Sequence, residues 1–158
     1  MYEKLNITEN HLRILVQFTR GFEKEYYIRE VQRLLQISPR TAQLILDDLE
    51  KKAILESKTR GKIRTYRLRK NRIARDYLMF TEIYKKIAFL SENRMIKEIV
   101  DKITPHIEGI GMLFGSYVKK KEKKESDIDL FVAGNVDKKA IEKIAKIYGK
   151  DIQVKNYP

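Results

Sequence analysis

The chain has 158 residues, 42% hydrophobic and 35% charged, and its 34 basic and 22 acidic residues give a net charge of +12, which suits a polyanionic partner if the excess is concentrated. Cysteine is absent, which excludes disulfides, thiolate zinc sites and cysteine nucleophiles, so any bound metal must be held by carboxylates. No apolar run approaches the roughly 20 residues of a membrane span, and the first residues lack the layout of a secretory signal, so we expect a cytoplasmic protein with no membrane partner.

The first third of the chain predicts three helices. After Thr8 as a possible cap, apolar residues recur at helical spacing until Gly21, and a short segment then leads into a second helix over 29–36. Ser38 followed by Pro39 is typical of an N-cap and a first helical residue, and the helix that follows has Ala42, Ile45, Leu46 and Leu49 on one side. Two short helices joined by a tight capped turn predict a helix-turn-helix unit.

A basic β-hairpin is predicted next, over residues 54–68. Two strand-like runs flank Arg60-Gly61, and Gly61 can supply the positive φ that a tight turn needs. Residues 51–75 contain eleven Lys and Arg and a single acid, Glu56, so the positive charge is concentrated here. Because the charges alternate with apolar residues, a folded hairpin fits better than a disordered tail.

This order of elements resembles the winged helix-turn-helix family of transcription regulators over about residues 8–70. The resemblance implies double-stranded DNA as a partner, and residues 1–70 carry 16 basic and 9 acidic residues, a net +7. We expect base contacts from the start of the third helix, by Arg40, Thr41 and Gln43, and phosphate contacts from the hairpin, by Lys58, Arg60, Lys62 and Arg64. Asp47 is expected on the same exposed face as Arg40 and Gln43, where its negative charge is unfavourable beside DNA. It either accepts a hydrogen bond from a cytosine amino group or marks where the contact with the groove ends. A winged helix used only for protein contacts is the alternative.

A long helix is predicted over 72–90, with apolar residues that exceed one stripe. Packing against the chain's own two domains would explain them, and so would a homodimer, which we predict. Ser91 is expected to cap a further helix that Pro105 ends. The predicted organisation is a DNA-binding domain over 1–70, a linker or dimerisation helix over 71–90, and a second domain over 91–158.

The second domain contains a group of residues suited to phosphate and metal chemistry. A buried strand over 107–114 ends in Gly115-Ser116, and Ser126-Asp127-Ile128-Asp129 opens another strand. Because side chains alternate along a strand, Asp127 and Asp129 should lie on the same side, as a divalent cation carrying nucleotide phosphates requires. Gly115 lets the backbone approach a phosphate, and Ser116 offers its hydroxyl and N–H groups.

Gly115-Ser116, nine intervening residues and Ser126-Asp127-Ile128-Asp129 resemble the motif of the minimal nucleotidyltransferases of the polymerase-β-like superfamily. The resemblance implies Mg²⁺ at Asp127 and Asp129, which would also be the catalytic residues of an active enzyme, and a third carboxylate on a later strand that activates the acceptor hydroxyl. It implies ATP or another nucleoside triphosphate as ligand, held by Gly115, Ser116, Ser126, Lys119 and Lys120. It also implies a separate helical partner protein, sometimes in an antitoxin pair.

The third carboxylate is where the sequence departs from the family. After a helix over 138–148, the last strand, over 150–156, places Gln153 at that position, with Asp151 as a weak substitute. We therefore expect an α+β protein whose winged helix is joined by a linker helix to a small nucleotidyltransferase-like domain with a mixed sheet. That domain should bind a nucleotide–Mg²⁺ complex with weak or absent transfer. The alternative is an active enzyme that moves a nucleoside monophosphate onto a protein or small acceptor.

Overall fold

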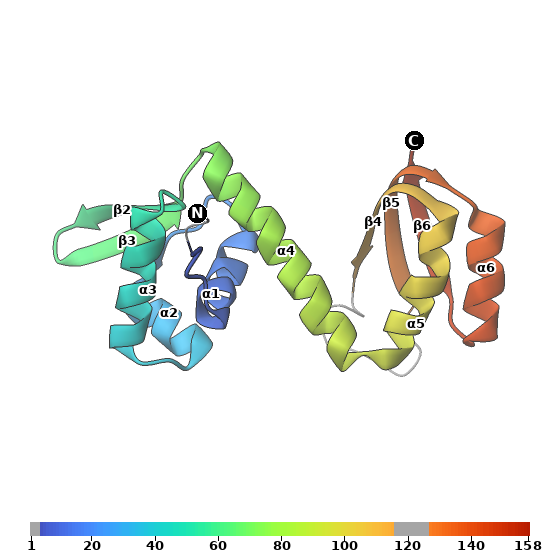
Figure 1. The fold of residues 1–158 in the computed structure, drawn as a ribbon, viewed down its shortest axis with the longest axis horizontal. Coiled ribbons are helices and arrows are strands. Elements are labelled where there is room, and N and C mark those ends of the chain that lie inside the picture. The colour runs from blue at the N-terminus through green and yellow to red at the C-terminus, as the bar shows by residue number, and fades with distance from the viewer. Residues whose placement is uncertain (1–3, 116–126) are drawn as a thin grey trace. The chain divides into compact units, whose positions relative to one another are not determined.

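The computed structural model describes residues 4–115 and 127–158 and divides into two compact units, Met1–Ile87 and Ala88–Pro158 (Figure 1). It has the α+β composition expected from the sequence, with a sheet in each unit. None of the helices in the described ranges is long and apolar enough to cross a membrane.

Unit 1 has the order of elements of a winged helix-turn-helix. Its elements are α1 (Glu9–Thr19), β1 (Tyr26–Tyr27), α2 (Ile28–Leu35), α3 (Pro39–Lys51), β2 (Leu55–Arg60), β3 (Ile63–Leu68) and the first part of α4 (Arg72–Glu92). The three strands form an antiparallel sheet in the order β1-β3-β2. The hairpin and the three helices were predicted; the pairing of β1 with β3 was not.

Local capping sets the turn between α2 and α3. The Ser38 Oγ accepts from the backbone N–H of Thr41 at 2.9 Å, and Pro39 is the first residue of α3, which confirms the predicted cap. Gln36 ends α2 with φ 55°, in the left-handed conformation that a tight helix ending needs. The turn between the two helices is therefore short and fixed at both ends.

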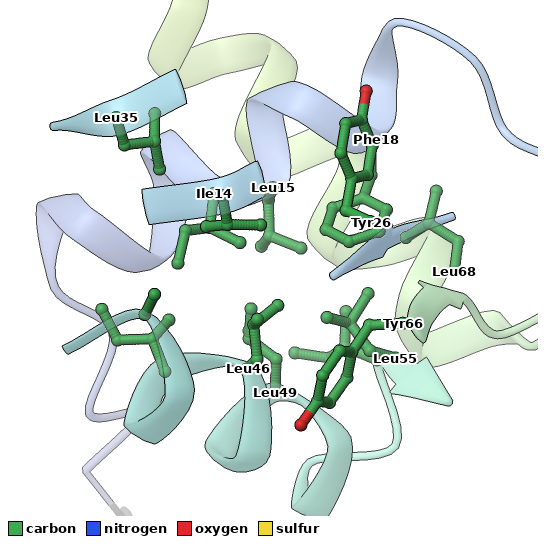
Figure 2. Packing of buried hydrophobic residues seen from close by; sticks show 14 of the residues in the cluster. Ile14, Leu15, Phe18, Tyr26, Leu35, Leu46, Leu49, Leu55, Tyr66 and Leu68 are labelled. Carbon is green, nitrogen blue, oxygen red and sulfur yellow. The ribbon is translucent and has the colours of Figure 1, made fainter. Parts of the chain in front are cut away.

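The core of unit 1 joins α3 to the hairpin (Figure 2). Tyr66 of β3 is fully buried in the same cluster as Leu46 and Leu49 of α3 and Leu55 of β2. Full burial of a large apolar side chain contributes roughly 1.5–3 kcal/mol. The orientation of the hairpin relative to α3 is thus set by packing.

The helix α4 extends beyond the predicted end at residue 90. Ala74 is buried, and Tyr77 and Leu78 pack against the core of unit 1. Ser91 was wrongly predicted to cap the next helix: it lies in the last turn of α4, and Asn93 occupies the N-cap position of α5. The backbone leaves the helical conformation at Asn93, where φ is −126° and ψ is 75°.

Unit 2 is a mixed sheet with helices on one face. After the end of α4 come α5 (Arg94–Ile103), η1 (Thr104–His106), β4 (Ile107–Phe114), β5 (Ile128–Val136), α6 (Lys138–Ile147) and β6 (Ile152–Tyr157). The strand order is β4-β5-β6, antiparallel between the first two and parallel between the last two, as the prediction of a mixed sheet requires. Both helices pack against alternate residues of β5, in one cluster that contains Ile96, Ile99, Ile103, Ile128, Leu130, Val132 and Ile141.

Candidate functional site

The start of α3 presents the residues predicted to contact bases. Arg40 is exposed, while Thr41 and Gln43 are half-buried. The Thr41 hydroxyl lies 2.8 Å from the Ser38 Oγ, so Thr41 takes part in the helix cap. Within the described part of the chain, Arg40 and Gln43 have no hydrogen-bonded or ionic partner, which leaves both side chains free for a ligand.

The tip of the hairpin presents three of the four cations predicted to contact phosphates. Arg60 pairs with Ile63 across a turn in which Gly61 has φ 60°, the positive value expected there. Lys58, Arg60 and Lys62 are exposed, and no described residue forms a hydrogen bond or an ion pair with their side chains. This arrangement places three free cations at or near one turn.

Arg64, the fourth of these cations, is held by acids of α3. Its Nη1 donates to Asp47 Oδ1 at 3.1 Å, its Nη2 to Glu50, and its Nε to the Ser57 Oγ at 2.9 Å. The strand register places Arg64 on the same face of the hairpin as Ser57 and the buried Tyr66. Arg64 therefore links the hairpin to α3.

Asp47 is compensated by two donors. Besides Arg64, the Tyr66 hydroxyl donates to Asp47 Oδ1 at 2.8 Å. Burial and the neighbouring Asp47 carboxylate raise the pKa of Tyr66 far above its usual value, so the phenol remains a donor. The negative charge that looked awkward beside DNA in the sequence is thus part of the contact between α3 and the hairpin.

A buried histidine connects the start of α1 with α3. The Thr8 N–H donates to His11 Nδ1 at 3.2 Å, and His11 Nε2 lies 3.2 Å from Asp48 Oδ2. Burial lowers the pKa of His11, against the opposing effect of Asp48. The sequence offered one signal for this role, because His11 stands three residues after the cap Thr8, where a capping box places its second partner.

In unit 2, the strand register brings the predicted metal ligands together. Asp129 of β5 lies between Phe114 of β4 and Gln153 of β6. Asp127, directly before β5, accepts a hydrogen bond on Oδ2 from the Gln153 Nε2 at 2.9 Å. Both carboxylates therefore share one face with Gln153. The other predicted nucleotide ligands, Ser116, Lys119, Lys120 and Ser126, lie outside the described residues.

Gly115 makes room for the Asp129 carboxylate. Its φ is +88°, and a Cβ added there would lie 2.0 Å from Asp129 Oδ2. The sequence predicts that this glycine lets a phosphate approach the backbone. In the structure, the glycine also leaves space for the carboxylate of Asp129. Any side chain at position 115 would displace the carboxylate or itself.

The residues present fit a magnesium ion that arrives with a phosphate ligand. In 4–115 and 127–158, no three His, Asp or Glu side chains gather as a metal site. Mg²⁺ commonly takes one or two carboxylates and completes its octahedron with substrate phosphates and water, so Asp127 and Asp129 suffice. Within the same ranges, Asp129 has no hydrogen-bonded or ionic partner.

A comparison with protein families finds a match that lies within unit 2. The family model described as "Polymerase beta, Nucleotidyltransferase" matches residues 94–156, from the first residue of α5 into β6. A comparison with curated proteins finds no match.

The solved structures that are similar to the chain include AdcR and AF1382. The adhesin competence repressor AdcR of Streptococcus pyogenes is 16% identical, with 65% of this chain and 79% of AdcR covered and a TM-score of 0.50. AF1382 from Archaeoglobus fulgidus is 21% identical, with 56% of this chain and 94% of AF1382 covered and a TM-score of 0.44. The fold of this chain thus combines a winged helix-turn-helix with a nucleotidyltransferase-like domain.

Proposed function

We propose that the protein is a DNA-binding transcription regulator whose C-terminal domain binds a nucleotide–Mg²⁺ complex and transfers nucleotides weakly or not at all. The hydrogen bond from Gln153 to Asp127 carries the second half of this proposal. A side-chain amide cannot take up a proton, so the position opposite Asp129 offers no general base. Two carboxylates nevertheless remain for a metal ion.

The DNA surface of the proposal comprises the start of α3 and the tip of the hairpin. Arg40, Thr41 and Gln43 would contact base edges in the major groove, and Lys58, Arg60 and Lys62 would contact phosphates. We assign Arg64 to holding the hairpin against α3, in place of the phosphate contact expected from the sequence, because Asp47 and Glu50 already engage its guanidinium.

A gel-shift titration tests DNA binding. Double-stranded genomic fragments are titrated with the wild type, with Arg60→Ala/Lys62→Ala, and with a control pair on α6, Lys139→Ala/Lys143→Ala. We expect the hairpin pair to bind weakly and the control pair to bind like the wild type, and repetition with Mg²⁺ and ATP tests for regulation. Equal affinities for all three proteins would contradict the assignment.

Calorimetry with ATP and Mg²⁺ tests nucleotide binding. Two ionised carboxylates on one face repel each other, and a divalent cation relieves that repulsion. Binding should therefore raise the melting temperature of the wild type and be lost in Asp127→Asn/Asp129→Asn. Asp101→Asn, at an exposed position of α5, is the matched control. Equal heats from the double variant and the wild type would reject the site.

An active nucleotidyltransferase is the second candidate, favoured by a family-model match that covers almost all of unit 2. In that case a nucleoside monophosphate passes from ATP to a protein or small acceptor, and a separate helical protein is a partner. Incubation with labelled ATP and Mg²⁺ separates the two candidates through labelled protein or released pyrophosphate.

We further propose a homodimer formed through α4. Ile73, Phe80, Ile83 and Ile87 are exposed and follow one another at intervals of seven, three and four residues, the spacing of a coiled-coil stripe. Four other apolar residues of α4 pack internally instead. Tyr77 and Leu78 pack against the core of unit 1, and Phe89 and Leu90 pack against the core of unit 2. Dimeric winged-helix regulators commonly read two half-sites one DNA turn apart.

A further inference from the structure

The face of the unit 2 sheet opposite α5 and α6 bears an ordered set of side chains. The register divides this face into rows that cross the three strands: Phe114–Asp129–Gln153, then Met112–Phe131–Lys155, then Ile110–Ala133–Tyr157. Two residues along a strand advance about 6.6 Å, so neighbouring rows are separated by that distance. The described part of unit 2 leaves large apolar side chains exposed here: Ile110 by 68%, Met112 by 55% and Tyr157 by 64%.

Each of the two rows beyond the carboxylates contains one aromatic ring. Phe131 and Tyr157 stack, with ring centroids 5.4 Å apart and an angle of 28° between the planes. Lys155 belongs to the middle row, and its Nζ lies 5.2 Å from the centroid of the Phe114 ring, which is in the carboxylate row. A stacked pair whose outer ring, Tyr157, is exposed and which has a cation in a neighbouring position is suited to a planar, electron-rich ring attached to an anion.

The order of groups along the strands matches the order of groups in a metal-bound nucleotide. Asp127 and Asp129 come first, where the metal would lie. The backbone of Lys155 is one row further, with its Nζ over Phe114 of the carboxylate row, and the Phe131–Tyr157 pair is one to two rows further. A nucleotide laid along the strands would meet the same sequence as metal, phosphate and base. The row spacing of about 6.6 Å is of the order of the reach from phosphate through ribose to base.

We infer that Tyr157, with Phe131 behind it, is the stacking surface for the base of the nucleotide whose Mg²⁺–phosphate part binds at Asp127 and Asp129. This inference rests on the proposed nucleotide binding and adds the base-binding residues and the cation Lys155. It requires a nucleotide to bind more tightly than a polyphosphate of equal charge, because inorganic triphosphate has no base to stack.

The first experiment compares ATP with inorganic triphosphate, each with Mg²⁺, by calorimetry on the full chain. Wild type should bind ATP about tenfold more tightly than triphosphate, the gain expected from one base-stacking contact. Tyr157→Ala should abolish this difference by weakening ATP alone, whereas Asp127→Asn should weaken both ligands. The matched control is Ile147→Ala on α6, whose side chain is 75% exposed.

The chain contains no tryptophan, so Tyr157→Trp places a single indole at the proposed surface, and its emission can be excited separately from that of the tyrosines. ATP should quench its emission, triphosphate should not, and neither should quench Ile147→Trp. Equal affinity of wild type for ATP and triphosphate, or a preference for ATP that survives in Tyr157→Ala, would overturn the inference while leaving the proposed metal site intact. Failure of wild type to bind either ligand would overturn the proposed function and this inference together.

Discussion

The side-chain amide of Gln153 donates to the Asp127 carboxylate at 2.9 Å, across 26 residues of sequence. The parallel pairing of β5 with β6 sets this contact, because it places Gln153 beside Asp129 with Asp127 on the same face. A neutral amide leaves both negative charges available to a cation but removes a proton acceptor. In the function that we propose, this arrangement lets a metal–nucleotide complex bind while transfer is weak or absent.

Gly115→Ala should abolish Mg²⁺–ATP binding. The new Cβ would collide with Asp129 Oδ2, and the backbone at φ +88° is strained for alanine, at a cost of about 1–3 kcal/mol. Gly149→Ala is the control, since φ there is +60° and no atom lies within 4 Å of the added Cβ. Thermal melting should show destabilisation of both variants, whereas calorimetry should show lost binding in Gly115→Ala alone. ATP binding by Gly115→Ala at wild-type affinity would contradict this role.

Arg64 and the cations of the hairpin tip should differ in salt dependence. Each phosphate contact contributes about 0.9 to the slope of log affinity against log salt, so Arg60→Ala/Lys62→Ala should reduce the slope by about 1.8. Arg64→Met should weaken binding with an unchanged slope, because it frees the hairpin from Asp47 and Glu50. Fluorescence anisotropy at several salt concentrations measures both quantities. If Arg64→Met reduced the slope by about 0.9, Arg64 would contact a phosphate, as the sequence predicted.

His11 should make the protein less stable in mild acid. Burial lowers its pKa below the ordinary 6.5, so the folded state favours the neutral ring, whose Nδ1 accepts from Thr8. The contribution of His11 is therefore fully present above pH 6.5 and decreases as the pH falls below that value. The pKa of Asp48 is lowered from its ordinary 3.8, so the contribution of Asp48 to the free energy of unfolding decreases only when the pH falls below 3.8.

Urea unfolding between pH 5 and pH 7.5 measures this effect. His11→Gln should show a flatter dependence of the free energy of unfolding on pH than the wild type. An identical pH dependence in wild type and His11→Gln would exclude the histidine as its source.

Local patterns in the sequence were sufficient for the helices and for most strands. Helical spacing and the Ser38-Pro39 pair located α3, and Gly61 located the hairpin turn, because these signals depend on neighbouring residues. Contacts between distant residues were not predictable in the same way. The strand β1 has two residues and exists through its pairing with β3, about 40 positions away.

The candidate sites show the same limit. Alternation along one strand predicted that Asp127 and Asp129 share a face, and Gln153 was recognised as the departure from the family. Its hydrogen bond to Asp127 depends on the register of a second strand, which the sequence did not provide. The contacts of Arg64 with Asp47 and Glu50 likewise depend on how the hairpin packs on α3, which the sequence did not show. The positive charge that was expected to contact DNA therefore forms ion pairs within unit 1.

Substitution of the exposed stripe of α4 should dissociate the proposed dimer. Ile83→Glu/Ile87→Glu places charges in the proposed interface between the two α4 helices. Ile147→Glu, at another exposed apolar position, serves as the control. Light scattering at micromolar concentration should give twice the chain mass of 18.8 kDa for wild type and control, and a single mass for the double variant. A wild type of single mass would exclude the dimer.

Pyrophosphate release from ATP and Mg²⁺ by wild type and Gln153→Glu tests the central claim most directly. Pyrophosphate leaves as the adenylyl group passes to an acceptor hydroxyl, in this assay water or a hydroxyl of the protein itself. The glutamate restores a group beside Asp127 and Asp129 that can take the proton of that hydroxyl, and a positioned general base contributes about 10² to 10⁴ in rate. With calorimetry run in parallel, we expect the wild type to bind the complex without appreciable release and Gln153→Glu to release pyrophosphate faster by up to that factor. Rapid release by the wild type, or ATP binding by neither protein, would contradict the account.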